Sequence, residues 1–157
     1  MNRMPPATPE FSLRPARPGD DEFALGMYLV ITRGFLSSHS GWNDDLITER
    51  FRKGYDPSQV QIVCADGMDV GWMQVSESDD GLHLDQIHLI EAYRHRGIGT
   101  RLVRDLLARA RHKRESVRLN VMRGNSAIEF YRRLGFAVTG SDEEKIQMRW
   151  DHVQPIE

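Results

Sequence analysis

Two closely spaced glycines, Gly97 and Gly99, restrict what this chain can fold into more than any other feature of the sequence. They lie between an apolar run that ends near Ile90 and a stretch in which apolar residues recur with helical spacing. Glycine allows backbone angles and close approaches that a Cβ atom blocks, and the first N–H groups of a helix have no partners within that helix. A strand, a glycine-containing turn and a helix in this order predict a turn that binds phosphate groups.

Two common nucleotide-binding motifs do not match this turn. The dinucleotide-binding fingerprint requires a third glycine at the position of Leu102. The P-loop requires Gly-Lys-Ser or Gly-Lys-Thr where this chain has Gly99, Thr100 and Arg101. Neither motif therefore identifies the ligand of the turn.

Hydrophobic periodicity and turn residues predict one α/β domain over residues 11–157, preceded by a flexible arm over residues 1–10. The expected strands cover 11–17, 59–65, 70–77, 82–90, 117–121, 136–139 and 146–150, and the expected helices cover 19–32, 44–53, 97–112 and 125–135. Strand 117–121 should lie parallel to strand 82–90, because a helix connects them. Asn125 should cap the last helix, and Gly135 should end it.

A second segment, residues 125–136, reads Asn-Ser-Ala-Ile-Glu-Phe-Tyr-Arg-Arg-Leu-Gly-Phe. Together with the Arg-x-x-Gly-x-Gly of residues 94–99, it resembles the acyl-coenzyme A signature of the GNAT acetyltransferase superfamily. The close resemblance covers residues 82–136. It implies a mixed, mostly antiparallel central sheet that is splayed at its one parallel strand pair, with helices on both faces. It also implies an enzyme that transfers an acetyl group from acetyl-coenzyme A to a primary amine by direct attack in a ternary complex.

The resemblance further implies which residues bind acetyl-coenzyme A. The phosphates would bind at the glycine turn, where Arg94 and Arg96 would offset their charge. The pantetheine arm would pair with the backbone near the end of strand 82–90. The expected cofactor-binding residues are Ile87, His88, Leu89, Arg94, His95, Arg96, Gly97, Ile98, Gly99, Thr100, Asn125 and Tyr131.

Tyr131 is the candidate catalytic acid that the resemblance implies. The thioester would end between the two parallel strands, where Tyr131 faces inward from the capped helix. A phenol in that position can donate a proton to the departing thiolate. The alternative is a core tyrosine that only fills the apolar stripe of its helix.

His83 and Asp85 are the candidate bases, which are needed because an ammonium group has no lone pair for attack. Strand alternation places both on one face of strand 82–90 and places His88, as a structural residue, on the other face. The two match positions where GNAT members often carry a base. Either can act directly or through an ordered water, and histidine is the residue type that titrates near neutral pH. The alternative for both is polar pairing on a solvated face of the sheet.

The sequence defines the acceptor less closely. In GNAT folds the loop that contains Trp42 lines the acceptor side, and Asp142, Glu143 and Glu144 lie in a hairpin that borders the same opening. Acidic surroundings suit a cationic amine. Among amines, a small-molecule or amino-acid-like acceptor is the favoured expectation. The alternatives are an N-terminal or lysine amine of a protein, or a domain that binds acyl-coenzyme A without turnover. The acyl-chain length stays open, as does the choice between monomer and homodimer.

Composition argues against several other classes. The net charge is −2 and the basic run 94–118 contains no aromatic residue, so no nucleic-acid partner is expected. Beyond Arg101 this run equally suits a solvated helix face. No apolar stretch is long enough to cross a membrane. The histidines and the single cysteine, Cys64, lack metal-ligand spacing, so no metal site is expected, and one cysteine agrees with a reducing cytoplasm.

Overall fold

The computed structural model describes residues 7–36 and 43–153, and every expected helix and strand is present in it. The elements along the chain are β1 (Ser12–Pro15), α1 (Asp20–Leu36), α2 (Asp44–Gly54), η1 (Pro57–Gln59), β2 (Val60–Ala65), β3 (Met68–Ser78), β4 (Gly81–Leu89), η2 (Glu91–Tyr93), α3 (Ile98–Lys113), β5 (Val117–Met122), α4 (Ala127–Arg133), β6 (Ala137–Ser141) and β7 (Lys145–Trp150). The α/β class predicted from the sequence is confirmed. Among the helices described, none is long and apolar enough to cross a bilayer.

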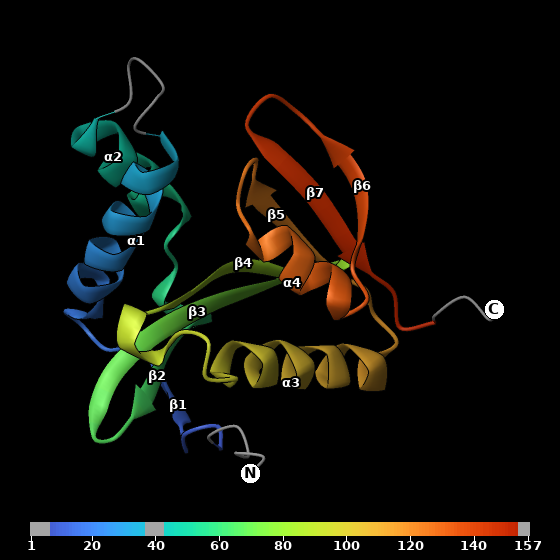
Figure 1. Ribbon diagram of the computed structural model, residues 1–157, viewed down its shortest axis with the longest axis horizontal. Helices are drawn as coiled ribbons and strands as arrows, with labels where there is room; N and C mark the ends of the chain where they lie inside the picture. The colour runs from blue at the N-terminus through green and yellow to red at the C-terminus, as the bar shows by residue number, and fades with distance from the viewer. Residues whose placement is uncertain (1–6, 37–42, 154–157) are drawn as a thin grey trace, which may run out of the picture.

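The strands form one mixed sheet in the order β1-β2-β3-β4-β5-β7-β6. β4 and β5 run parallel, joined by α3, and the other neighbouring pairs run antiparallel. The parallel pairing covers only Leu82–Leu84 against Val117–Leu119. Beyond it the two strands separate, and Figure 1 shows them leaving in different directions. The predicted splayed sheet with one parallel pair is confirmed.

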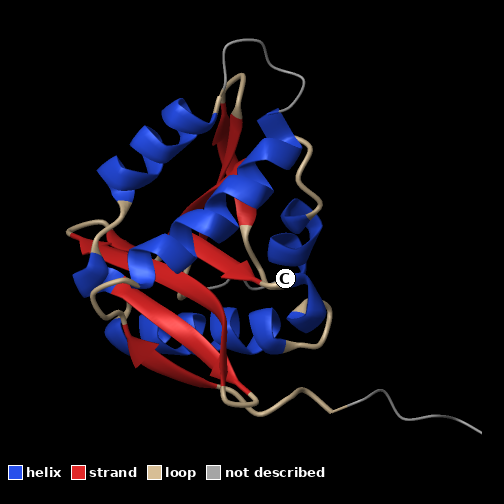
Figure 2. Cartoon of the chain, turned by 90° about the vertical axis from the view of Figure 1, so that its left-hand side faces the viewer, coloured by secondary structure: helices blue, strands red, loops and turns tan. Residues whose placement is uncertain are grey.

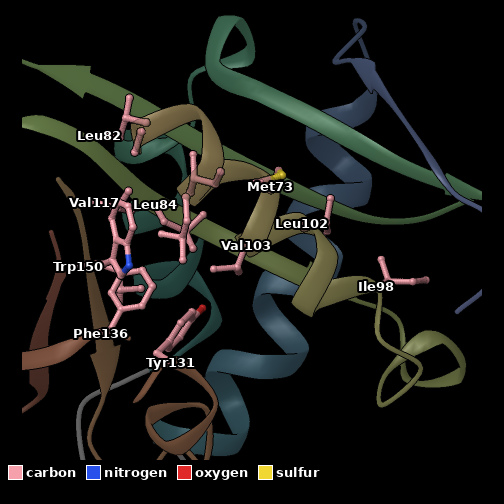
Figure 3. Close-up of a cluster of buried hydrophobic side chains, with 14 of the residues drawn as sticks. Met73, Leu82, Leu84, Ile98, Leu102, Val103, Val117, Tyr131, Phe136 and Trp150 are labelled. Carbon is pink, nitrogen blue, oxygen red and sulfur yellow. The ribbon is translucent and has the colours of Figure 1, made fainter. Parts of the chain in front are cut away.

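Two apolar clusters lie on opposite faces of the sheet, and Figures 1 and 2 show the helices on either side of the strands. The α3 cluster joins the inward faces of α3 and α4 to β3, β4, β5 and β7, and Figure 3 shows part of it. The α1–α2 cluster joins Ala24 of α1 and Phe51 of α2 to β2 and β3. On β5 and β7 the face away from α3 carries exposed polar side chains, among them Asn120 and Gln147. The sheet is therefore apolar on both faces at its β2–β3 part and polar on one face beyond β4.

A β-bulge interrupts β4 in the middle. Gln74 and Val75 are consecutive on β3, but their partners on β4 are Gln86 and Leu84, so Asp85 is an extra residue. An extra residue shifts the alternation of side chains by one position. Residues after Asp85 therefore face the side opposite to the one that simple alternation from His83 predicts.

The bulge corrects the expectation for His88. Ile87, which simple alternation places beside His83, packs into the α3 cluster instead. The His88 ring lies 5.1 Å from the Trp72 ring and 6.4 Å from the Tyr28 ring, on the α1–α2 face. His88 thus shares a face with His83. The prediction was wrong because a bulge depends on pairing with β3, which the pattern of one strand does not reveal.

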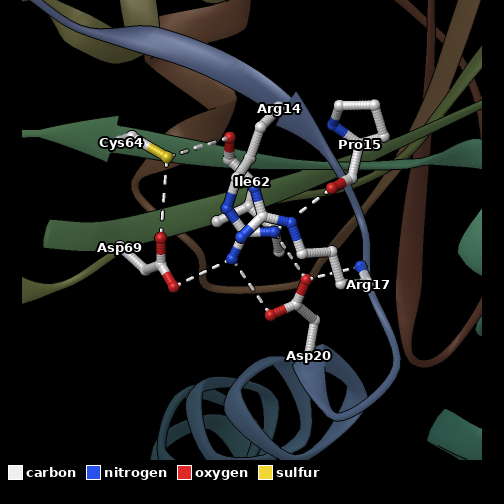
Figure 4. Close-up of polar contacts among 7 residues, drawn as sticks. All are labelled: Arg14, Pro15, Arg17, Asp20, Ile62, Cys64 and Asp69. Atoms are coloured by element: carbon white, nitrogen blue, oxygen red, sulfur yellow. Dashed lines mark hydrogen bonds and ion pairs between the residues drawn. The ribbon is translucent and has the colours of Figure 1, made fainter.

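A polar cluster fixes the start of α1 to the sheet edge (Figure 4). The Arg14 guanidinium donates to both carboxylate oxygens of Asp20, at 2.8 and 3.1 Å, and to Asp69 of β3 at 2.9 Å. These charge-assisted bonds hold the pKa of Asp20 below its usual value. Cys64 lies beside the same group, with its Sγ 3.5 Å from Asp69, and burial raises the pKa of its thiol. The cluster ties β1, α1 and β3 together.

Candidate functional site

The start of α3 presents uncapped backbone N–H groups. Gly97 occupies the N-cap position with φ of +90°, and no side chain caps the helix. The first helical hydrogen bond runs from the Arg101 N–H to the Gly97 carbonyl at 3.1 Å. In α2, by contrast, the Asn43 side chain accepts from Leu46 N–H. The first turn of α3 therefore has unpaired donors and the positive end of the helix dipole, which together fit an anionic group.

The residues before Gly97 are exposed, and two of them are fixed by local contacts. Arg94 donates through Nε to the Leu89 carbonyl at 2.8 Å, and the Arg96 guanidinium lies 5.0 Å from the centre of the Tyr93 ring. His95 has φ of +59°, an uncommon conformation for a residue with a side chain. The turn therefore holds two guanidinium groups beside the uncapped helix end, as expected for a phosphate-binding turn.

The two glycines of the turn differ in what surrounds them. A Cβ on Gly97 would lie 2.5 Å from Oγ1 of Thr8, and the backbone is left-handed there. A Cβ on Gly99 would meet only Phe130, at 3.9 Å, which is an ordinary contact. The fold itself therefore requires glycine at position 97 but leaves room for a methyl group at position 99. The open space beside Gly99 fits a ligand that approaches the backbone closely.

The end of β4 offers backbone groups on its β5 side. Beyond Leu84 the described part of β5 no longer pairs with β4. The side chains of Ile87 and Leu89 pack into the α3 cluster, so only their backbone faces this edge. The Leu89 carbonyl already accepts from Arg94. An extended ligand chain can pair with the remaining edge in the manner of an added strand.

His83 and Asp85 form a hydrogen-bonded pair where the two parallel strands begin to separate. His83 Nδ1 lies 2.9 Å from Oδ1 of Asp85, and both side chains are half-buried. The other oxygen of Asp85, Oδ2, is buried and has no hydrogen-bond partner among the described residues. The expectation that the two side chains project together is confirmed.

Tyr131 comes from α4 on the opposite face. It is 7% exposed, and its ring packs against Phe130 and Phe136 at centroid distances of 5.1 and 5.6 Å. In Figure 3 its hydroxyl points away from Phe136, and in the described chain this hydroxyl has no hydrogen bond to another residue. Burial raises the pKa of Tyr131 to about 12. The phenol is therefore protonated at neutral pH.

The turns around α4 hold Tyr131 in place as the sequence predicts. Oδ1 of Asn125 accepts from the Ala127 N–H at 2.9 Å, so Asn125 caps the helix start. Gly135 has φ of +102°, and the Phe136 N–H returns to the Tyr131 carbonyl at 3.1 Å. Both terminal residues therefore have the roles expected of them.

Acidic residues of the β6–β7 hairpin make contacts within the protein that the sequence does not reveal. Asp142 accepts from the backbone N–H groups of Glu144 and Lys145, at 2.8 and 2.7 Å, and these bonds lower its pKa. The Glu144 carboxylate lies 3.8 Å from the Arg50 guanidinium. Two of the three acids are therefore already engaged within the protein. Trp42, the other residue expected on the acceptor side, lies outside the described residues.

Sequence reasoning missed one residue beside the His83–Asp85 pair. Arg118 of β5 is the direct partner of His83 in the parallel register. In the sequence it is only one of the charges of the basic run 94–118. The available signal is its position between Val117 and Leu119, two buried residues of the α3 cluster, because alternation then places Arg118 on the other face.

Comparison with known proteins agrees with this architecture. The model of the Acetyltransferase (GNAT) family matches residues 27–136. The fold is similar to that of the PaiA N-acetyltransferase from Thermoplasma acidophilum in complex with coenzyme A, with 19% identity and a TM-score of 0.72 over 90% of this chain and 99% of that chain. It is also similar to Ard1 from Thermoplasma volcanium, with 21% identity and a TM-score of 0.64 over 92% and 99%.

A third similar structure is the ribosomal-protein-S18-alanine N-acetyltransferase from Escherichia coli, with 16% identity and a TM-score of 0.66 over 94% of this chain and 97% of that chain. No curated protein matches the sequence. Identities this low establish a shared fold, whereas the family match spans more than half of the chain. The chain belongs to the Acetyltransferase (GNAT) family and is an acetyl-coenzyme A-dependent acetyltransferase.

Proposed function

We propose that the protein transfers the acetyl group of acetyl-coenzyme A to the primary amine of a small-molecule or amino-acid-like acceptor, by direct attack in a ternary complex. The observation that carries this proposal is the His83–Asp85 pair, at 2.9 Å, where β4 and β5 cease to pair. The pair offers a proton acceptor at the opening between the strands. Tyr131, which is protonated at neutral pH, packs in the α3 cluster on the other face of β4.

The uncapped first turn of α3 and the two arginines before it would hold coenzyme A. The N–H groups of Gly97, Gly99 and Thr100 suit its pyrophosphate, and Arg94 and Arg96 supply positive charge. The free edge of β4 near Ile87 suits the amide groups of its pantetheine arm. When bound, coenzyme A supplies the acyl group in an activated thioester.

The His83–Asp85 pair would deprotonate the incoming ammonium group. Asp85 orients the imidazole through its Oδ1, and its second oxygen is available to a cationic group. A proton that leaves the amine can be taken by the imidazole, directly or through one water. Tyr131 would then supply a proton to the thiolate, because its phenol is protonated at neutral pH. Most of the rate would come from holding amine and thioester in contact.

A thiol-release assay tests this proposal. The protein is incubated with acetyl-coenzyme A and a panel of small amines, free amino acids and peptides, and product masses are measured. We expect release of coenzyme A with an added acetyl group on a small amine. Turnover on peptides alone would instead indicate a protein acetyltransferase, and binding of acetyl-coenzyme A without turnover on any amine would indicate a binding module.

We further infer a cytoplasmic protein that acts as a monomer or homodimer. The single cysteine, Cys64, supports a reducing compartment. Fractionation of the source cells and light scattering of the purified protein test the two parts of this inference separately.

A further inference from the structure

Arg118 occupies the position on β5 beside the proposed base. Its Cα is paired with that of His83, and it lies on the same face of the sheet. Asp85 follows His83 by two residues on β4, at the point where the pairing with β5 has just ended, and its side chain shares the face of His83. Side chains from these two positions can therefore contact the two ends of one compact molecule.

The guanidinium of Arg118 is weakly held in its present position. Its Nη2 lies 3.4 Å from Oδ2 of Asp80, whose side chain is 77% exposed. An ion pair with so exposed a partner contributes little stability. The Nε–H of Arg118 is buried and has no hydrogen-bond partner among the described residues, which makes the present arrangement costly. Arg118 is therefore able to exchange Asp80 for a carboxylate that engages the guanidinium fully.

Asp85 offers the complementary group. Its Oδ1 is bonded to His83, and its Oδ2 has no partner in the described chain. The ion pairs of the described residues join Asp85 to His83 and Arg118 to Asp80, but not Asp85 to Arg118. Two opposite charges thus lie on adjacent strands without neutralising each other. A molecule that carries an amine and a carboxylate a few ångströms apart can satisfy both.

We propose that Arg118 selects acceptors that carry a carboxylate next to the amine, so that the acceptors are free amino acids. This inference rests on the proposed function. A guanidinium binds a carboxylate through two parallel N–H donors, which fixes both distance and orientation. The amine is then directed to Asp85 and His83. A protein N-terminus has a peptide group where the amino acid has its carboxylate, and a polyamine brings a second cation toward Arg118.

Matched acceptors test the inference. Initial rates are measured for free amino acids, their α-carboxamides and the corresponding decarboxylated amines. We expect kcat/KM for the best amino acid to exceed that for its carboxamide at least about tenfold. Arg118→Gln should remove this preference by raising KM for the amino acid, and should leave the two analogues that lack a carboxylate within about twofold of their wild-type rates. Asp80→Asn should lower KM for the amino acid, because Asp80 competes for the same guanidinium.

Arg149→Gln is the matched control. Arg149 pairs with Arg118 across β5 and β7, but its Nε already donates to Asp151 at 2.8 Å, so its loss should preserve the preference. Calorimetry with coenzyme A confirms that each variant is folded and retains its cofactor site. Equal rates for acid and carboxamide in the wild-type protein, or equal losses on all acceptors in Arg118→Gln, overturn the inference alone. Absence of thiol release with every amine overturns the proposed function as well.

Discussion

The two faces of β4 differ in the kind of polar group that they offer to a ligand. On the α3 face its side chains are apolar, and Leu82, Leu84, Ile87 and Leu89 all pack into the α3 cluster. Apart from the Tyr131 hydroxyl, the polar groups that we describe on that side belong to the backbone, at the open strand edge and at the uncapped start of α3. On the other face the side chains are polar, with His83 bonded to Asp85. His88 is likewise bonded to Gln86.

In the proposed function, the backbone groups on the α3 side of β4 bind coenzyme A, and the polar side chains on its other face meet the amine acceptor. A backbone site depends on glycine and on strand geometry, and it tolerates many side chains nearby. A side-chain site depends on residue identity, so single substitutions change which acceptor fits. We therefore expect substitutions on the two faces to separate cofactor binding from turnover.

The largest difference between the loss of turnover and the loss of cofactor affinity should come from Tyr131→Phe. The hydroxyl has no hydrogen bond in the described chain, so its loss should leave the free energy of unfolding and the affinity for acetyl-coenzyme A nearly unchanged. If the phenol donates the proton, kcat should fall by a factor on the order of 10². Steady-state kinetics and calorimetry measure the two quantities. Tyr55→Phe, which removes a buried hydroxyl that has no partner among the described residues, is the control and should keep wild-type kcat.

Arg14→Ala tests whether the contacts that fix α1 to the sheet can be lost without changing the affinity for coenzyme A. Loss of the bonds to Asp20 and Asp69 should lower the free energy of unfolding by about 1.5 kcal/mol at neutral pH. Arg14 lowers the pKa of folded Asp20, so this stability is complete above the unfolded pKa of aspartate, about 3.9, and is lost as pH falls through the folded pKa. Urea unfolding should therefore show the difference between wild type and variant shrinking in acid.

The exposed pair of Arg33 and Asp44 provides the control for that measurement. Arg33→Ala should change stability by less than about 0.5 kcal/mol, because exposed ion pairs contribute little. A loss as large as that of Arg14→Ala would show that burial does not distinguish the two pairs. Unchanged affinity for coenzyme A in Arg14→Ala would support independent fixing of the two faces.

His83→Ala and Asp85→Ala should lower turnover most at low pH. An amine that arrives protonated needs a base, whereas one that is already neutral does not. We expect a loss of about tenfold near pH 6 that shrinks toward pH 9, measured as kcat/KM on the identified acceptor. A loss that is constant across the pH range would point to misplacement of the acceptor instead.

The smallest effect should come from Gly99→Ala. The protein has room for the methyl group, so stability should be retained, while the affinity for coenzyme A should fall about fivefold because the ligand can no longer approach the backbone. Gly97→Ala, in contrast, should lower both affinity and stability, since a side chain there is strained and meets Thr8. Wild-type affinity in folded Gly99→Ala would contradict the phosphate-binding role of the turn.

Sequence reasoning succeeded where the signal is local. Turn glycines, the Asn125 cap and the spacing of apolar residues predicted the elements, and the connecting helix predicted the parallel pair. It failed where position depends on a neighbouring strand. The face of His88 depends on the bulge opposite Gln74, and the importance of Arg118 depends on its register with His83. Neither relation leaves a trace in the pattern of a single strand.

The bulge also determines where β4 can lose a residue and keep its packing. It divides β4 into two short segments, and side chains alternate regularly between the two faces within each segment. Deletion of Asp85 would make Leu84 and Gln86 consecutive partners of Val75 and Gln74, which restores regular alternation and leaves Ile87 and Leu89 in the α3 cluster. Most replacements of single residues in β4 likewise leave this alternation unchanged. Asp85 is therefore a residue that β4 can lose without turning its apolar side chains out of the core, so the bulge adds a carboxylate to the polar face and leaves the packing of the α3 face unchanged.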